Sequence, residues 1–267
     1  MSDTNRTISF RDREFKGSRL RCLLLTSREP REVAEFLSAL VFPYAEVNFT
    51  EQWAPRGFRE PDEAKLGETD GFLSDEDRKL ITNWWLAKSG GANTPNWDLV
   101  SSCRMGDRQG LILVEAKAHE GEMVNDRCGS KNKENFNRIK DALNEATNAW
   151  NEMLPGFALS ADSHYQLSNR FAFAWKIAKM GIPVVLVYLG FLDANEMTTP
   201  SRILLKSDQQ WQTCILEKSS GLVPKEVWNK TFDLNGTPLT ILLRSAVVTI
   251  ASDVIGNKDD IKSKGHK

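Results

Sequence analysis

The sequence predicts an α/β protein in which a central mixed β-sheet is flanked by helices. Two strand-like runs at 97–103 and 110–118 are separated by a short polar loop, which predicts an antiparallel hairpin. An amphipathic segment at 165–180 leads into the apolar run at 182–192, as expected for a helical crossover to a buried strand. A hairpin and a crossover in one chain favour a sheet with both antiparallel and parallel pairing.

Length and composition support one elaborated domain. The chain has 267 residues, of which 40% are hydrophobic and 27% charged, close to the averages of globular proteins. We expect a core at 73–195, preceded by a βα unit and an extended arm at 1–72. A C-terminal addition at 196–256 is expected to pack on that core, and a disordered tail follows at 257–267.

The N-terminal part should begin with a strand. The run LRCLLLT at 20–26 predicts a short buried strand, and residues 29–40 predict an amphipathic helix. The segment 48–71 is rich in proline, glycine and charge without a sustained period, which predicts an extended loop.

Further helices and a second hairpin should surround the sheet. Ser74, with Asp77 three residues later, predicts the start of a helix that ends at Gly90-Gly91. Residues 133–152 predict a long amphipathic helix, and residues 208–218 a shorter one. The run at 232–243 contains Asn235-Gly236, a strong hairpin-turn signal.

Composition also limits the compartment and the partners. No apolar window is long enough to span a bilayer and the N-terminus lacks a secretory signal, so we expect a cytoplasmic protein with no membrane contact. The four cysteines are widely spaced and indicate neither zinc nor a disulfide framework. A net charge of −1 means that any contact with nucleic acid is local. Candidate basic patches are Lys131, Lys133, Arg138 and Lys140, and also Arg170, Lys176 and Lys179.

Two charged residues interrupt the strand at 110–118. Because strand side chains alternate, Glu115 and Lys117 share a face with Leu111 and Leu113, whereas Ala116 faces the opposite side. A buried carboxylate and ammonium are costly unless they pair with each other or bind something.

The hairpin register brings a second carboxylate to this face. If Cys103 pairs with Gly110, Asp98 lies directly opposite Glu115, at a Cβ separation of about 5 Å. Two carboxylates at that separation repel unless one is protonated or a cation lies between them. Magnesium fits such a pair, and Mn²⁺ is a substitute, with the Ala116 carbonyl as a third ligand. Lys117 would then position or deprotonate the attacking water, or stabilise charge on the phosphorane.

These residues resemble those of the PD-(D/E)xK nuclease superfamily, also called restriction-endonuclease-like. The match consists of Asp98 and Glu115-Ala116-Lys117, in a helix, hairpin, helix and strand order over about residues 75–192, with Trp97 where proline commonly precedes the aspartate. The resemblance implies a restriction-endonuclease-like core, a Mg²⁺-dependent endonuclease and a nucleic-acid substrate, with DNA as the expected polymer, and it allows a homodimer. It also implies a role for Gln166 in orienting water or phosphate. A further carboxylate from upstream is common, and Glu68, Glu76 and Asp77 are the candidates.

Two alternatives remain open. The chain can be a catalytically inactive module of the nuclease fold that binds nucleic acid or a protein partner. It can also be an α/β protein in which Glu115 and Lys117 form only a structural ion pair, and removal of Glu115 would then chiefly lower stability.

Overall fold

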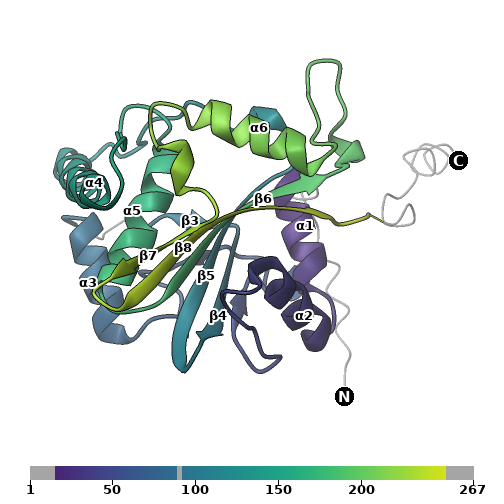
Figure 1. Cartoon of the computed structure of the whole chain (residues 1–267), viewed down its shortest axis with the longest axis horizontal. Helices are drawn as coiled ribbons and strands as arrows, with labels where there is room; N and C mark the ends of the chain where they lie inside the picture. Colours follow the sequence, from purple (N-terminus) through teal and green to yellow (C-terminus); the bar gives the residue numbers. More distant parts are fainter. Residues whose placement is uncertain (1–15, 89–91, 251–267) are drawn as a thin grey trace, which may run out of the picture.

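A six-stranded mixed sheet runs through the centre of the protein, with helices on both faces (Figure 1). The computed structural model describes residues 16–88 and 92–250, so the tail predicted at 257–267 lies outside the described residues. The predicted α/β class with a mixed sheet is confirmed. The strands follow the order β1 (Trp53–Ala54), β4 (Leu99–Met105), β5 (Arg108–Lys117), β6 (Val184–Leu192), β8 (Thr237–Val247) and β7 (Lys230–Leu234).

Each half of the sheet contains a hairpin, and the two halves meet in parallel pairing. β4 and β5 are antiparallel, β5 pairs with β6 in parallel, and β6 pairs with β8 in parallel. The chain crosses from β5 to β6 through helices, as the sequence predicted. β7 and β8 form the second predicted hairpin, in which Asn235 and Gly236 both have positive φ (54° and 83°), as a tight primed turn requires.

The two faces of the sheet are covered by different helices (Figure 1). α1 (Gly17–Thr26) and α2 (Pro30–Val41) pack on the face that receives Ile112, Val114 and Ala116. The opposite face receives Leu111 and Leu113, so the predicted alternation along β5 is confirmed. This second face is covered by α3 (Asp75–Trp85), α4 (Lys133–Met153), α5 (Tyr165–Lys179) and α6 (Asp208–Lys218).

The strand predicted at 20–26 is wrong, because this segment is helix α1. Leu20, Leu23 and Leu25 are all buried, since the helix is enclosed by the sheet and its neighbours. A helix buried on most sides shows a continuous apolar run, and such a run cannot be distinguished from a buried strand by period alone. The predicted N-terminal βα unit is therefore a pair of helices.

The other helices agree with the prediction in type. The Ser74 side chain caps α3 by accepting from Asp77 N, but α3 ends at Trp85, and Gly90-Gly91 lies outside the described residues. The helices predicted at 29–40, 133–152, 165–180 and 208–218 are present as α2, α4, α5 and α6. Short 3₁₀ turns complete the description: η1 (Gly57–Arg59), η2 (Glu120–Glu122), η3 (Asn195–Met197) and η4 (Lys225–Val227).

The segment predicted as an extended loop at 48–71 is held along the edge of the sheet. It contains β1, which pairs with β4, and β2 (Ala64–Lys65), which pairs with β3 (Asn96–Trp97). The segment therefore passes beside the start of β4, where Asp98 lies. Within the described ranges, none of the helices has the length and apolarity needed to cross a membrane.

Candidate active site

Asp98 lies at the end of the β4–β5 ladder. The predicted pairing of Cys103 with Gly110 is confirmed, and the ladder continues to Leu99 opposite Val114. It stops there, so Asp98 is not paired backbone to backbone with Glu115, which corrects the predicted direct opposition. Instead, an Asp98 carboxylate oxygen accepts a 2.8 Å hydrogen bond from the Ala116 N–H. The loss of regular pairing frees the aspartate to turn its side chain toward β5.

Glu115 is buried between two cations. Its side chain is 1% exposed, and its two oxygens contact different partners. Lys117 Nζ contacts Oε1, and Arg170 Nε donates to Oε2 at 2.6 Å. The Arg170 guanidinium also lies 4.5 Å from the centre of the Trp97 ring, a distance typical of a cation–π contact. The negative charge of Glu115 is therefore neutralised by Lys117, on the same face of β5, and by Arg170 of α5.

Gln166 joins this cluster from the first turn of α5. Its Oε1 accepts a 2.9 Å hydrogen bond from Lys117 Nζ. The Gln166 backbone N–H, free of an intrahelical partner at this position, donates to the carboxylate of Asp126 at 3.1 and 3.2 Å. This contact fixes the start of α5, so the side chain is directed at Lys117. The structure thus brings together all four residues predicted as catalytic: Asp98, Glu115, Lys117 and Gln166.

The two carboxylates have opposite electrostatic behaviour. Burial and the negative charge of Glu115 raise the pKa of Asp98 to about 8. Burial also acts to raise the pKa of Glu115, but Arg170 and Lys117 outweigh it and hold that pKa below its ordinary value. Without a further cation, Asp98 is therefore protonated at neutral pH while Glu115 is charged. A divalent ion at Asp98 would reverse this by favouring the ionised carboxylate.

Glu63 is a neighbouring carboxylate that sequence reasoning missed. Ala64 of β2 pairs with Trp97 of β3, so continuation of this antiparallel register places Glu63 opposite Asp98. Its negative charge contributes to raising the pKa of Asp98, and its Oε2 accepts a 3.1 Å hydrogen bond from Asn96. In the sequence, Glu63 lies in a segment without a hydrophobic period. The strand that begins next to it has two residues, which is too short to be predicted from a pattern.

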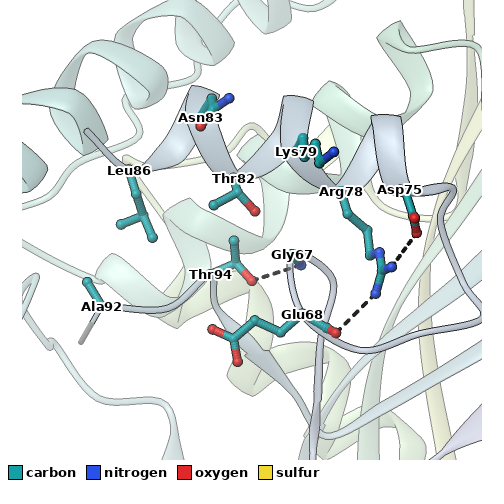
Figure 2. A pocket seen from close by; sticks show the side chains of 10 residues that line it. All are labelled: Gly67, Glu68, Asp75, Arg78, Lys79, Thr82, Asn83, Leu86, Ala92 and Thr94. Carbon is teal, nitrogen blue, oxygen red and sulfur yellow. Dashed lines mark hydrogen bonds and ion pairs between the residues drawn. The ribbon is translucent and has the colours of Figure 1, made fainter. Parts of the chain in front are cut away.

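The three upstream carboxylates named from the sequence lie elsewhere. Glu68 lines a cavity of about 400 Å³ beside α3, where Arg78 donates to its backbone oxygen and contacts Asp75 (Figure 2). Asp77 accepts a 2.6 Å hydrogen bond from Ser74, and Glu76 is exposed in the first turn of α3. Across the described ranges, none of the three shares a hydrogen bond or ion pair with Asp98 or Glu115.

The residues present fit a hard divalent cation that keeps part of its water shell. Asp98 and Glu115 provide two carboxylates, and one or two is the usual protein contribution to a magnesium site. The N–H and C=O of a strand residue face the same neighbour, so the Ala116 carbonyl is on the same side as Asp98. Among the residues that the structure describes, no group of three or more His, Cys, Asp or Glu side chains forms a metal-binding cluster. Glu63 contributes to this site through its charge, which acts on Asp98.

The cluster is partly open to solvent. Lys117 and Arg170 are 6% and 4% exposed, whereas Asp98, Gln166 and Glu63 are half-buried. A ligand would therefore approach past these three residues.

Comparison with known proteins does not place the chain in a family. No protein-family model, no curated protein and no solved structure matches it. The resemblance to the PD-(D/E)xK superfamily thus depends on Asp98, Glu115-Ala116-Lys117 and the geometry around them.

Proposed function

We propose that this protein is a Mg²⁺-dependent nuclease that hydrolyses phosphodiester bonds, with DNA as the substrate. One observation supports this most strongly. Asp98, Glu115, Lys117 and Gln166 come from three separate segments of the chain, yet they form one connected cluster at the half-buried end of the β4–β5 hairpin. We also propose that the mixed sheet is the core of a restriction-endonuclease-like fold.

The roles follow from the chemistry of each group. Asp98 and Glu115 would hold the Mg²⁺, with the Ala116 carbonyl on the same side. The bound ion would polarise the phosphate and lower the pKa of a coordinated water. Lys117 would orient that water or stabilise the charge that develops on the phosphorane, and Gln166 would keep the Lys117 ammonium in place.

Glu115 must release one of its present partners for this site to form. Arg170 contacts both the Glu115 carboxylate and the ring of Trp97, so moving it would break two interactions. Lys117 has a second acceptor in Gln166 and a flexible stem. We therefore assign Lys117 as the group that turns from Glu115 toward the substrate phosphate.

The same ion pairs favour the alternative function. With Glu115 neutralised by Lys117 and Arg170, the cluster is electrostatically satisfied at that residue without a metal. A nuclease-fold module that binds nucleic acid or a protein without cleaving would also retain this arrangement. Activity measurements separate the two functions.

The test is cleavage of single- and double-stranded DNA with Mg²⁺, with Mn²⁺ and with EDTA. Wild type is compared with Asp98→Asn, which keeps the shape and the acceptor for Ala116 N but removes the charge. Glu76→Gln, on the exposed start of α3, is the matched control. We expect metal-dependent cleavage by wild type and control and a loss of at least 100-fold in Asp98→Asn, as for a group that acts in the transition state. Equal cleavage by all three proteins would refute the nuclease, and no cleavage by any would favour the binding module.

A further inference from the structure

A cleft of about 700 Å³ lies between the end of α1, the start of α2 and the segment that contains β1 and η1. Its lining is more polar than apolar, and three arginines contribute to it: Arg28, Arg56 and Arg59. All three are exposed. Phe49 and Trp53 also line the cleft, and Phe49 is 48% exposed. Cationic and aromatic side chains therefore meet in one concave surface.

The cleft borders the same sheet edge as the candidate active site. The segment 55–63 leaves the sheet after Ala54, which pairs with Val100, and returns at Ala64, which pairs with Trp97. The pairing partners, Val100 and Trp97, both lie within two positions of Asp98 in the sequence. A ligand in the cleft would thus lie on a segment whose two ends flank the proposed metal site.

Contacts with α1 hold this segment in place. Gly57 N donates to Thr26 Oγ1 at 2.9 Å, and Phe58 N donates to Ser27 Oγ at 3.2 Å. Gly57 has a φ of +61°, and a Cβ there would lie 2.2 Å from Ser27 Oγ. Only glycine permits this close approach, so the wall of the cleft is a built feature of the fold.

The arginines and glutamates that line the cleft are equal in number, but they differ in how many partners they have. Within the described part of the chain, the side chains of Arg28, Arg56 and Arg59 form no ion pair. Three glutamates also line the cleft: Glu29, Glu51 and Glu60. Glu29 is engaged in the capping box of α2, and Glu51 accepts from Ser102 and Gln109. Glu29 and Glu51 keep their negative charge, but hydrogen bonds hold both carboxylates in place. Among the described residues, none holds a guanidinium group of the three arginines in an ion pair, so these groups can turn toward a phosphate.

The second basic patch named from the sequence, at Arg170, Lys176 and Lys179, does not offer an equivalent surface. Lys176 and Lys179 both pair with Glu145 and lie over tryptophan rings, and Arg170 is buried against Glu115. The near-neutral net charge requires that nucleic-acid contacts be local. The cleft satisfies that requirement.

We propose that this cleft binds a single strand of nucleic acid and directs it to Asp98. Arg28, Arg56 and Arg59 contact the phosphates, and unpaired bases stack on Phe49 and Trp53. A single strand is favoured because stacking on these rings requires bases free of a complementary strand. The inference rests on the proposed function for the identity of the ligand, but it concerns binding and not hydrolysis.

The test measures binding in EDTA, where no metal-dependent cleavage occurs. A fluorescein-labelled oligo-dT of about 20 nucleotides, longer than the span of one small binding groove, is titrated and its anisotropy recorded. Arg56→Glu/Arg59→Glu is compared with Lys131→Glu/Lys133→Glu, which makes the same change of charge at exposed residues near the start of α4. Circular dichroism and melting verify that both variants fold.

We expect the arginine variant to bind at least tenfold more weakly than wild type and the lysine variant to bind within threefold of it. Loss of two phosphate contacts should also make the slope of log K against log salt shallower by about 1.4. Phe49→Ala should weaken binding roughly tenfold. Binding is measured without a divalent ion, so a failure of catalysis leaves this result intact.

Three outcomes would overturn the proposal. The first is that wild type does not bind the oligonucleotide. The second is that both charge variants lose affinity equally, which would indicate that the overall charge of the protein, and not this cleft, determines binding. The third is tighter binding to the matching duplex than to the single strand.

Discussion

Lys117 joins Glu115 to Gln166: its Nζ contacts Oε1 of Glu115 and donates a 2.9 Å hydrogen bond to Oε1 of Gln166. The lysine therefore connects the β-sheet to the start of α5 inside the candidate site. We predict that Lys117→Met abolishes metal-dependent cleavage while the protein stays folded, since Arg170 still neutralises Glu115. Cleavage assays with parallel thermal melts measure both effects. Full activity in the variant would exclude a role for the ammonium in the reaction.

Removing Glu115 should affect stability much more than removing Lys117. Glu115→Ala leaves Lys117 and Arg170 buried without their anion, which typically costs about 3–5 kcal/mol. Urea denaturation gives the free energy of unfolding, and Glu76→Ala on the exposed start of α3 should change it by less than about 0.5 kcal/mol. A loss below about 1 kcal/mol for Glu115→Ala would show that the cluster is solvated and the ion pairs are weak.

Asp98 should make the metal-free protein less stable as pH rises. Its pKa is about 8 in the folded state, against an ordinary value of 3.8. Between these pH values the folded state retains a proton that the unfolded state has lost. The free energy of unfolding is therefore highest at low pH and falls as the pH rises toward 8. Asp98→Asn cannot ionise and should lack this decline. Urea melts from pH 5 to pH 8 in EDTA compare the two proteins, and parallel curves would show that Asp98 is not perturbed.

Glu63 should raise the affinity of the site for the metal without being a ligand. The negative charge of Glu63 acts on Asp98 from the neighbouring β2 strand. Residues that support metal ligands from outside the ligand set typically contribute 10–100-fold to affinity, so we expect Glu63→Gln to weaken Mn²⁺ binding roughly tenfold. Calorimetric titration measures the affinity. Glu60→Gln, an exposed residue three positions earlier, is the control and should bind as wild type does.

The central hairpin could be predicted because its signals are local. Strand alternation placed Glu115 and Lys117 on one face, and the loop between the strands fixed Cys103 opposite Gly110. The same pattern placed Asp98 beside them, although the exact contact is with Ala116 N. Register and alternation are properties of neighbouring residues, so one sequence is sufficient to infer them.

The remaining parts of the site depend on contacts between distant segments. Arg170 reaches Glu115 across 55 positions and stacks on Trp97, and in the sequence it resembled a solvated charge on a helix face. Glu63 reaches Asp98 through a two-residue strand that has no detectable period. α1 is enclosed on most sides, so its sequence shows a continuous apolar run like that of a strand. In each of these cases tertiary packing, which periodicity does not report, determines the outcome.

The most direct test of the metal site is a crystal structure of the protein soaked with Mn²⁺ and measured at the manganese absorption edge. We expect an anomalous peak within about 2.0–2.3 Å of carboxylate oxygens from both Asp98 and Glu115, with Lys117 Nζ withdrawn from Glu115 and Arg170 still in place. A peak elsewhere would contradict the assignment. So would the absence of a peak, with Glu115 still bound by both Lys117 and Arg170.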